Sequence, residues 1–247
     1  MRRRKEEVLS ELPPKRRTIQ EVAKNDNLYI KLITKSVELA EQIPLAPDMD
    51  KSMLLLMAVE NSRKATGIAK SQHVAEFVKL ILETGEPCLL FAYHHDVMAL
   101  YEKYLKKFNP LFITGLENKE QKQENIDYFM NGHTNLLIIN LRTTAGLNLQ
   151  RARCVIFGEL DWSPAVHTQA EDRVHRIGQK DSVLAYYLVT DTISDIEISA
   201  CLKLKQQQFT GLMLDKKETE SEKYISQVEA QKFMWNIVNK LRKKEEN

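Results

Sequence analysis

Short apolar runs and longer amphipathic segments alternate along the middle of the chain. Continuous apolar runs, of the kind found in strands buried on both faces, occupy residues 88–92, 111–113, 136–139, 154–157 and 183–189. Between and after them, apolar residues recur every three or four positions, which predicts helices over roughly 97–108, 165–177 and 193–204. Asn118 with Gln121 offers a capping pair, which predicts a further helix over roughly 118–129. Strands that alternate with helices of this length predict an α/β fold with a doubly wound parallel sheet.

The segments on either side of this pattern are predicted to be helical. Residues 27–70 favour helix with interruptions at Pro44 and Pro47, because proline lacks the backbone donor of a helix interior. We expect a further break at Thr66-Gly67 and then a separate helix that ends at Gly85. Near the C-terminus, four apolar residues at helical spacing predict an amphipathic helix that packs on the core or on an absent neighbour: Met234, Ile237, Val238 and Leu241.

The N-terminal segment is basic and contains a pair of prolines. Residues 2–5 and 15–17 are all Lys or Arg, and Pro13-Pro14 lies between them. Paired prolines favour an extended backbone, since the residue before each proline is kept out of the α region. These residues alone leave two interpretations open: a solvated basic tail, or a connector from a preceding part of a longer protein.

Length, charge and cysteine content limit the kinds of protein that this chain can be. A chain of 247 residues with 43% hydrophobic content can bury one sizeable core with a smaller helical addition. The net charge of +2 excludes a generally basic protein, so nucleic-acid contact would need a local patch. Cys88, Cys154 and Cys201 are widely spaced, and the apolar runs are far shorter than a membrane span. We therefore expect a soluble protein of a reducing compartment, without disulfides and without membrane contact.

The residues that carry chemistry concentrate between 142 and 179. On a helix, Gln169, Arg173 and Arg176 would share one face, because they are four and three residues apart. Two guanidiniums beside an amide form a receptor for a polyanion, since each guanidinium offers planar paired donors to phosphate oxygens. Taken alone, an ordinary surface helix with an Asp172–Arg176 pair is the more frequent interpretation of such a segment.

The string at residues 169–179, QAEDRVHRIGQ, favours the first interpretation because it resembles the last helicase motif of the Swi/Snf-type ATPases, QAxDRxHRIGQ, at every fixed position. The resemblance to this family of superfamily-two motors covers residues 2–208. Residues 3–15 are similar to the segment that joins the family's two lobes, and residues 89–91 to the first strand of its second lobe. Glu159-Leu160, together with the residues of the last motif (QAEDRVHRIGQ), resembles the strand-annealing branch of the family.

Three further motifs support the resemblance. Residues 160–164 (LDWSP) are similar to the family's D-W-N-P with serine in place of asparagine, and residues 146–149 (GLNL) to its G-I-N-L. Gly115, Lys122 and Phe129 fall at the family's G…R…F spacing, with lysine in place of arginine.

The resemblance implies the second RecA-like lobe of a DNA-dependent ATPase that translocates on duplex DNA. In that scheme ATP and Mg²⁺ are held mainly by a first lobe absent from this chain. Arg176 and Arg173 are the implied catalytic residues, reaching across the cleft to the phosphates. The implied nucleotide-binding set is Gln169, Arg173, Arg176, Gly146 and Asn148. The implied division is an inter-lobe connector (1–25), a helical protrusion (26–75), the helicase lobe (76–210) and a C-terminal helical extension (211–247).

The expected DNA-binding residues follow predicted strands. Arg142, Thr143 and Thr144 come after the third strand, at the edge where α/β sheets place ligands, and their hydroxyls and amides suit a DNA phosphate. A plain turn is the alternative there. The resemblance adds His94, at the end of the first strand, and Lys122. The expected partners are the first lobe and double-stranded DNA.

Two motifs that would hold ATP and Mg²⁺ are missing from the sequence. It contains neither a G-x-x-x-x-G-K-[ST] loop nor a D-E-x-H acidic pair, so we expect it to hydrolyse ATP only together with a first lobe. His167 and Glu171 lack a third ligand nearby, so we expect no metal site. We expect a monomer, cytoplasmic if prokaryotic or from a phage and nuclear if eukaryotic. The alternative function is a non-catalytic platform that binds DNA or protein, which the intact motif residues disfavour.

Overall fold

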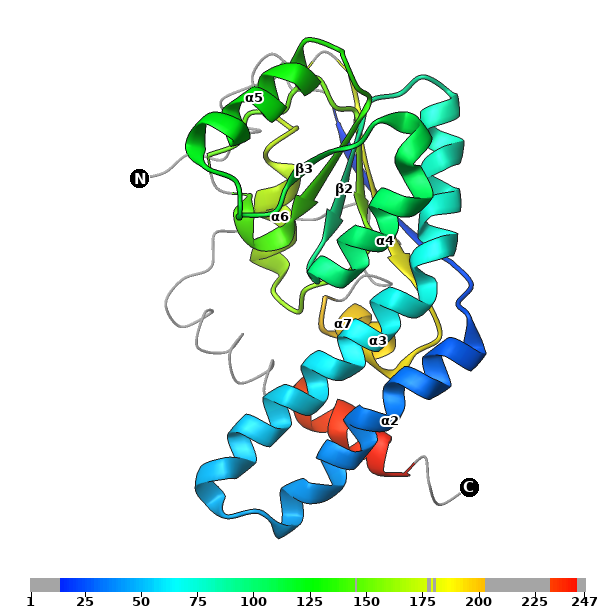
Figure 1. Ribbon diagram of the computed structural model, residues 1–247, viewed down its shortest axis with the longest axis vertical. Helices are drawn as coiled ribbons and strands as arrows, with labels where there is room; N and C mark the ends of the chain where they lie inside the picture. The colour runs from blue at the N-terminus through cyan, green and yellow to red at the C-terminus, as the bar shows by residue number, and fades with distance from the viewer. Residues whose placement is uncertain (1–13, 145, 177–178, 180, 203–231, 244–247) are drawn as a thin grey trace.

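The computed structural model describes residues 14–144, 146–176, 179, 181–202 and 232–243. Within these ranges a six-stranded sheet lies at one end of the molecule, and a long helical hairpin extends from it (Figure 1). Every strand pair is parallel, and the strand order is β1-β6-β5-β2-β4-β3. The strands are β1 (Lys15–Glu21), β2 (Cys88–Ala92), β3 (Leu111–Ile113), β4 (Leu136–Asn140), β5 (Cys154–Phe157) and β6 (Val183–Val189). The predicted parallel α/β sheet is confirmed.

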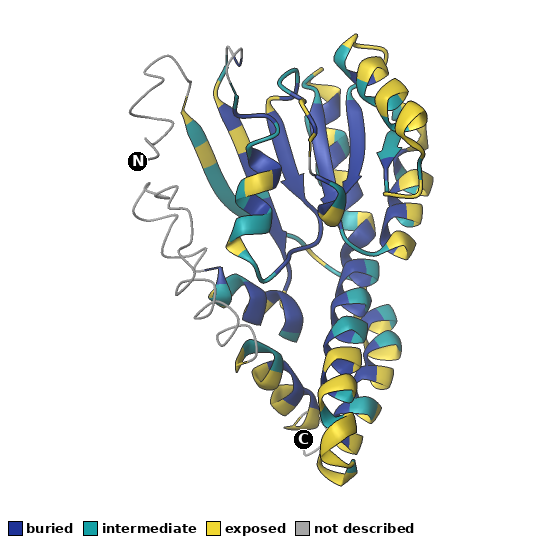
Figure 2. Cartoon of the chain, turned by 90° about the vertical axis from the view of Figure 1, so that its left-hand side faces the viewer, coloured by how far each residue is buried: buried dark blue, intermediate teal, exposed yellow. Residues whose placement is uncertain are grey.

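Helices cover both faces of the sheet. The helices are α2 (Asp26–Gln42), α3 (Asp48–Glu83), α4 (His95–Leu105), α5 (Lys119–Met130), α6 (Pro164–Glu171) and α7 (Ile193–Cys201). Val78 of α3 and Tyr101 of α4 belong to an apolar cluster on one face, whereas Phe129 of α5 and Ala170 of α6 belong to a cluster on the other. In Figure 2 the strands of the centre are buried between these helical layers.

The hairpin of α2 and α3 has an apolar core of its own. The short 3-10 helix η1 (Ile43–Leu45) joins the two helices, and Pro47 caps the start of α3, so the predicted interruption by two prolines is confirmed. The predicted C-terminal helix is also confirmed over residues 232–242, where Ile237, Val238 and Leu241 are buried against the hairpin (Figure 1).

The predicted break at Thr66-Gly67 is wrong, because α3 runs without interruption from Asp48 to Glu83. A Cβ atom at position 67 would lie 2.5 Å from Oε1 of Glu159 and 2.9 Å from Cγ2 of Val97. The glycine is therefore explained by the close approach of α3 to Val97 of α4 and to Glu159, which follows β5, and not by helix termination. The boundary expected between residues 75 and 76 falls inside this helix.

The apolar pattern does not predict β1, whose sequence KRRTIQE is polar. It pairs with β6 from Lys15 opposite Val183 to Glu21 opposite Val189, as an edge strand. The residues before each proline, which were expected to be extended, lie with the rest of residues 1–13 outside the described residues. In the part of the chain that is described, no helix combines the length and apolar character needed to cross a membrane.

Candidate functional site

The arginine motif continues beyond the end of α6 in a series of short turns. The predicted helix over 165–177 is too long, since α6 ends at Glu171. Beyond it, the amides of Arg173 and Val174 donate to carbonyls only three residues back, and the amide of Arg176 to one only two residues back. We call residues 172–176 the arginine turn. Gln169 is exposed on α6 while both arginines lie outside it, so the expectation of one shared helical face is corrected. Residues 177 and 178, where the helix was expected to end, lie outside the described residues.

Arg173 and Arg176 are half-buried neighbours of like charge. Burial lowers the pKa of Arg173, and the positive charge of Arg176 lowers it further. The Nε of Arg173 is buried and has no hydrogen-bond partner among the described residues. The Nε of Arg176 donates to the carbonyl of Asp172 at 2.9 Å. Two like charges held close together, with a donor left unsatisfied, would be stabilised by an anion.

The loop between β4 and β5 packs against the arginine turn. The amide of Leu149 donates to the carbonyl of Arg173 at 2.9 Å. Asn148, the residue before Leu149, is exposed, and Gly146 is exposed with a φ of 76°. The structure thus joins the loop that carries two of the expected nucleotide-binding residues to the turn that carries the arginines.

Glu171 is a residue whose role the sequence did not predict. It is fully buried, and its carboxylate accepts hydrogen bonds from Nε of Arg17 at 2.7 Å and from the hydroxyl of Tyr187 at 2.9 Å. Its other oxygen lies 2.5 Å from Nη2 of Arg17 and 3.0 Å from Nζ of Lys15. We call these four residues the Glu171 clasp. Burial alone would raise the pKa of Glu171, but the charges of Lys15 and Arg17 lower it to about 2.

A second polar cluster lies at the carboxyl ends of β2 and β5. Nδ1 of His94 lies 2.7 Å from Oε1 of Glu159, and Nε2 lies 3.3 Å from Oε2 of Glu60 on α3. The buried Glu159 also accepts from the amides of Tyr93 and His94 at 2.8 and 2.9 Å. Burial would lower the pKa of His94, but its two carboxylate partners raise it above its usual value. His94 therefore connects the end of β2 to α3. An acidic residue soon after a buried strand was the available signal for Glu159.

Arg142 lies at the surface beside this cluster. Its guanidinium carbon is 4.7 Å from the centre of the Tyr93 ring, and that of Arg63 is 4.3 Å from the same centre. Arg63 is buried, donates to the carbonyl of Leu160 at 2.9 Å and lies 4.7 Å from the ring of Trp162. Tyr93 thus connects the exposed arginine to a buried one on α3.

The other expected DNA-binding residues differ in exposure. The hydroxyl of Thr143 donates to the carbonyls of Ile113 and Asn140 at 3.1 and 2.9 Å, and Thr144 is only 4% exposed. Lys122 is half-buried on α5. Among the three consecutive residues 142–144, exposure therefore falls from the arginine to the second threonine, and the threonines shape the loop that presents Arg142.

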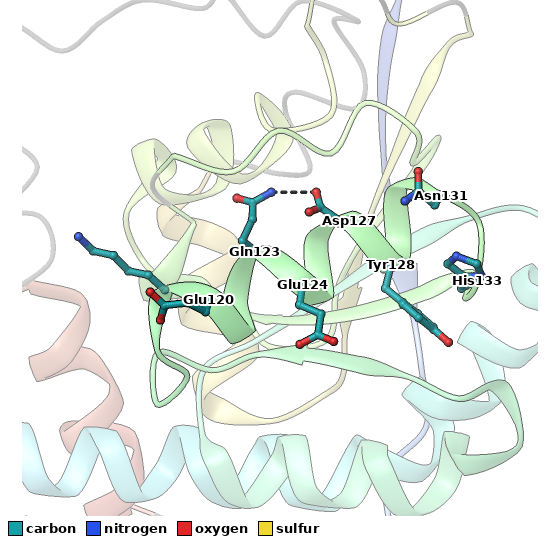
Figure 3. Close-up of a pocket in the computed structure, with 8 residues that line it drawn as sticks. Glu120, Gln123, Glu124, Asp127, Tyr128, Asn131 and His133 are labelled. Atoms are coloured by element: carbon teal, nitrogen blue, oxygen red, sulfur yellow. Dashed lines mark hydrogen bonds between the residues drawn. The ribbon is translucent and has the colours of Figure 1, made fainter.

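A cavity of about 570 Å³ lies on α5 and the turn that follows it, and Figure 3 shows the residues that line it. Its lining includes the carboxylates of Glu120, Glu124 and Asp127, which would repel a phosphate, and none of the expected nucleotide- or DNA-binding residues. This cavity does not suit a nucleotide. Over the described ranges, no group of three or more His, Cys, Asp or Glu side chains could hold a metal ion.

The helicase conserved C-terminal domain family matches residues 70–178. The chain is similar to the SWI/SNF-related matrix-associated actin-dependent regulator of chromatin subfamily A-like protein 1 of Xenopus tropicalis, with 36% identity over 200 residues, 79% of this chain and 21% of the relative. It is also similar to the DNA annealing helicase and endonuclease ZRANB3 of Homo sapiens, with 30% identity over 244 residues, 96% of this chain and 22% of the relative. The chain spans about a fifth of the length of these curated relatives.

A solved structure has the same fold. The Sulfolobus solfataricus SWI2/SNF2 ATPase core in complex with dsDNA superposes with a TM-score of 0.65 at 19% identity, over 90% of this chain and 49% of that one. At this identity the likeness concerns the fold alone, and it confirms the RecA-like α/β architecture expected from the sequence.

Proposed function

Because this chain is a C-terminal helicase domain of the Swi/Snf type, we propose that it is the second motor lobe of a DNA-dependent ATPase that translocates on duplex DNA. In this proposal Arg176 and Arg173 act as arginine fingers on an ATP held, together with Mg²⁺, by a first lobe of the same protein. The observation that carries the proposal is the pair of half-buried, like-charged guanidiniums beside the loop of Asn148.

The roles of the side chains follow from their chemistry. ATP, when bound, supplies a phosphoryl group whose transfer concentrates negative charge on its oxygens. Arg173 and Arg176 stay charged and present planar N–H donors, so they suit that charge better than a flexible ammonium would. Gln169 and Asn148 add exposed amides, and Gly146 lets the backbone approach a phosphate closely because it has no side chain.

We assign the DNA contact chiefly to Arg142. It is exposed beyond the carboxyl end of β4, where parallel sheets place ligands, and its guanidinium is steadied by the ring of Tyr93. Thr143 and Thr144 would shape this loop, His94 would support it, and Lys122 would add a second positive charge. The similarity to the DNA annealing helicase and endonuclease ZRANB3 of Homo sapiens supports DNA as the partner.

The variant Arg176→Lys tests the proposal in a protein that carries both lobes. Lysine keeps the charge but lacks the planar fork, so DNA-stimulated ATP hydrolysis should fall by about 10³- to 10⁵-fold, or roughly 4–7 kcal/mol of transition-state stabilisation. The matched control is Arg153→Lys, at a half-exposed arginine whose ion pairs lie at the surface. Near-normal turnover by Arg176→Lys would refute the proposal, provided that its melting temperature matches that of the control.

DNA binding with and without a first lobe separates the motor lobe from the platform. This chain by itself should hydrolyse ATP negligibly, because its sequence has no phosphate-binding loop. A platform would bind DNA equally well with or without a first lobe, and its affinity would fall steeply with salt. The proposed compartment is the nucleus if the protein is eukaryotic and the cytoplasm if it is prokaryotic or from a phage.

A further inference from the structure

We infer that Glu171 is a positioning residue for the arginine fingers, and that it acts by fixing the arginine turn to strand β1. The inference rests on the proposed function of Arg173 and Arg176. Glu171 stands one residue before the arginine turn, and its carboxylate is held by Lys15 and Arg17, more than 150 positions earlier in the chain. Arg17 makes two contacts with the carboxylate, which fixes its orientation as well as its position.

The clasp is connected to both guanidiniums by short paths. The carbonyl of Glu171 accepts from the amides of Val174 and His175 at 3.0 Å, so the backbone of the turn is built on this residue. The carboxylate of Asp172 lies 3.9 Å from Nζ of Lys15, and the carbonyl of the same Asp172 accepts from Nε of Arg176. A displacement of β1 relative to α6 would therefore be passed to Arg176 through two contacts.

A second anchor holds the turn from the other side. Leu149 donates to the carbonyl of Arg173, and Nε2 of Gln179 donates to the carbonyls of Gln150 and Ala152 at 3.1 and 2.9 Å. With only the loop of residues 149–152 as a support, the turn could rotate about it. The clasp supplies the second point that defines the direction of the guanidiniums.

The charges of the Glu171 clasp are buried, which suits a role in fixing the position of the arginine turn. The side chains of Lys15 and Arg17 are 8% and 12% exposed, and Glu171 is fully buried. Replacing a buried ion pair by well-packed apolar groups is often neutral or stabilising, so such a cluster is a poor means of holding a sheet edge together. Lys15 and Arg17 share one face of β1, whereas Arg16 between them is exposed. The chain directly before β1 is the part that resembles the inter-lobe connector, so the clasp joins the arginine motif to the strand that the connector enters.

The test compares Arg17→Ala with the matched control Arg16→Ala in a protein that carries both lobes. A misplacement of about 1 Å can cost about 10²-fold in rate, so we expect kcat for DNA-stimulated ATP hydrolysis to fall by at least about tenfold in Arg17→Ala. The KM for ATP and the dissociation constant for duplex DNA should change little, because the first lobe holds most of the nucleotide and Arg142 is untouched. Arg16→Ala should behave as the wild type. Arg17→Lys, which keeps the charge but not the fork, should give an intermediate kcat.

Two outcomes would overturn the inference. One is an unchanged kcat in Arg17→Ala while Arg176→Lys is inactive, which would leave the proposed function standing. The other is a loss of kcat that merely follows the folded fraction measured by circular dichroism at the assay temperature. If Arg17→Ala does not fold, Arg17→Lys decides by the same criterion, since a wild-type kcat there would also overturn the inference.

Discussion

The substitution Glu171→Gln should lower the stability of the chain at neutral pH and change it little in acid. Glutamine keeps the size of the side chain and removes the charge that Lys15 and Arg17 surround. The pKa of Glu171 is lowered from 4.5 to about 2 in the fold. Each pKa unit corresponds to about 1.4 kcal/mol, so the charged form contributes on the order of 3 kcal/mol. Removing one partner of a buried ion pair independently costs about 3–5 kcal/mol.

The sign of the pH dependence follows from the direction of the shift. A carboxyl group whose pKa is lowered by folding stabilises the protein fully above its unfolded-state pKa, here near 4.5. That contribution is lost as the pH falls through the folded-state pKa, near 2. The difference in unfolding free energy between wild type and Glu171→Gln should therefore be largest above pH 4.5 and should approach zero near pH 2, where protonated Glu171 is as neutral as glutamine.

The measurement is urea unfolding of this chain, followed by circular dichroism at neutral pH and at several lower values. Glu120→Gln is the matched control, since it makes the same chemical change at an exposed position on α5 and should show no such dependence. The reasoning would be refuted if the deficit of Glu171→Gln stayed constant down to pH 2, or if it were below about 1 kcal/mol at neutral pH.

Three further predictions concern the contacts of α3 and β2. Gly67→Ala should lower the free energy of unfolding, measured by urea denaturation, by about 1–2 kcal/mol, because a clash with the buried Glu159 outweighs the gain of about 1 kcal/mol in helix propensity. A variant more stable than the wild type would contradict this. Lys70→Met removes the ammonium that lies 2.7 Å from the buried Asp195 carboxylate, so it should lower the free energy of unfolding by about 3–5 kcal/mol, and adding Asp195→Asn should recover part of that loss. If thermal unfolding of the double variant showed no recovery, the ion pair would not be the cause. Because folding raises the pKa of His94, the protonated imidazole stabilises the fold fully below pH 6.5, and this stabilisation is lost as the pH rises through the pKa of His94 in the folded protein. An NMR titration of His94 with a midpoint at or below 6.5 would disprove this prediction.

The elements that the sequence predicted well are those governed by local physics. The apolar runs at β2, β3, β5 and β6 match the strands at both ends, because these strands carry apolar or aromatic side chains at every position. The predicted cap of α5 is also present, with Asn118 and Gln121 bonded to each other's backbone as a capping box. These features depend on residues within a few positions of one another.

The elements that the sequence did not predict depend on distant contacts. β1 has a polar sequence, so apolar periodicity could not reveal it, and two of its charged side chains, Lys15 and Arg17, contact the distant Glu171. Gly67 looks like a helix breaker until Glu159, more than 90 residues later, is placed against it. The strand order, which brings β1 beside β6, has no local signal at all.

In the candidate site, the sequence predicted which side chains matter but not how they are arranged. The sequence predicted Arg173 and Arg176 as an anion receptor through the resemblance to the helicase motif, since the residues taken alone favoured an ordinary surface helix. It placed them on a helix, whereas they stand on turns held at one end by Glu171 and at the other by Leu149. Turns have no fixed side-chain spacing of their own, so the direction of the two guanidiniums is set by whatever anchors the turns. If the anchors determine that direction, a substitution that contacts no phosphate can still change catalysis. This is why the comparison of Arg17 with Arg16, two adjacent arginines of one strand, is the sharper test of how this lobe works.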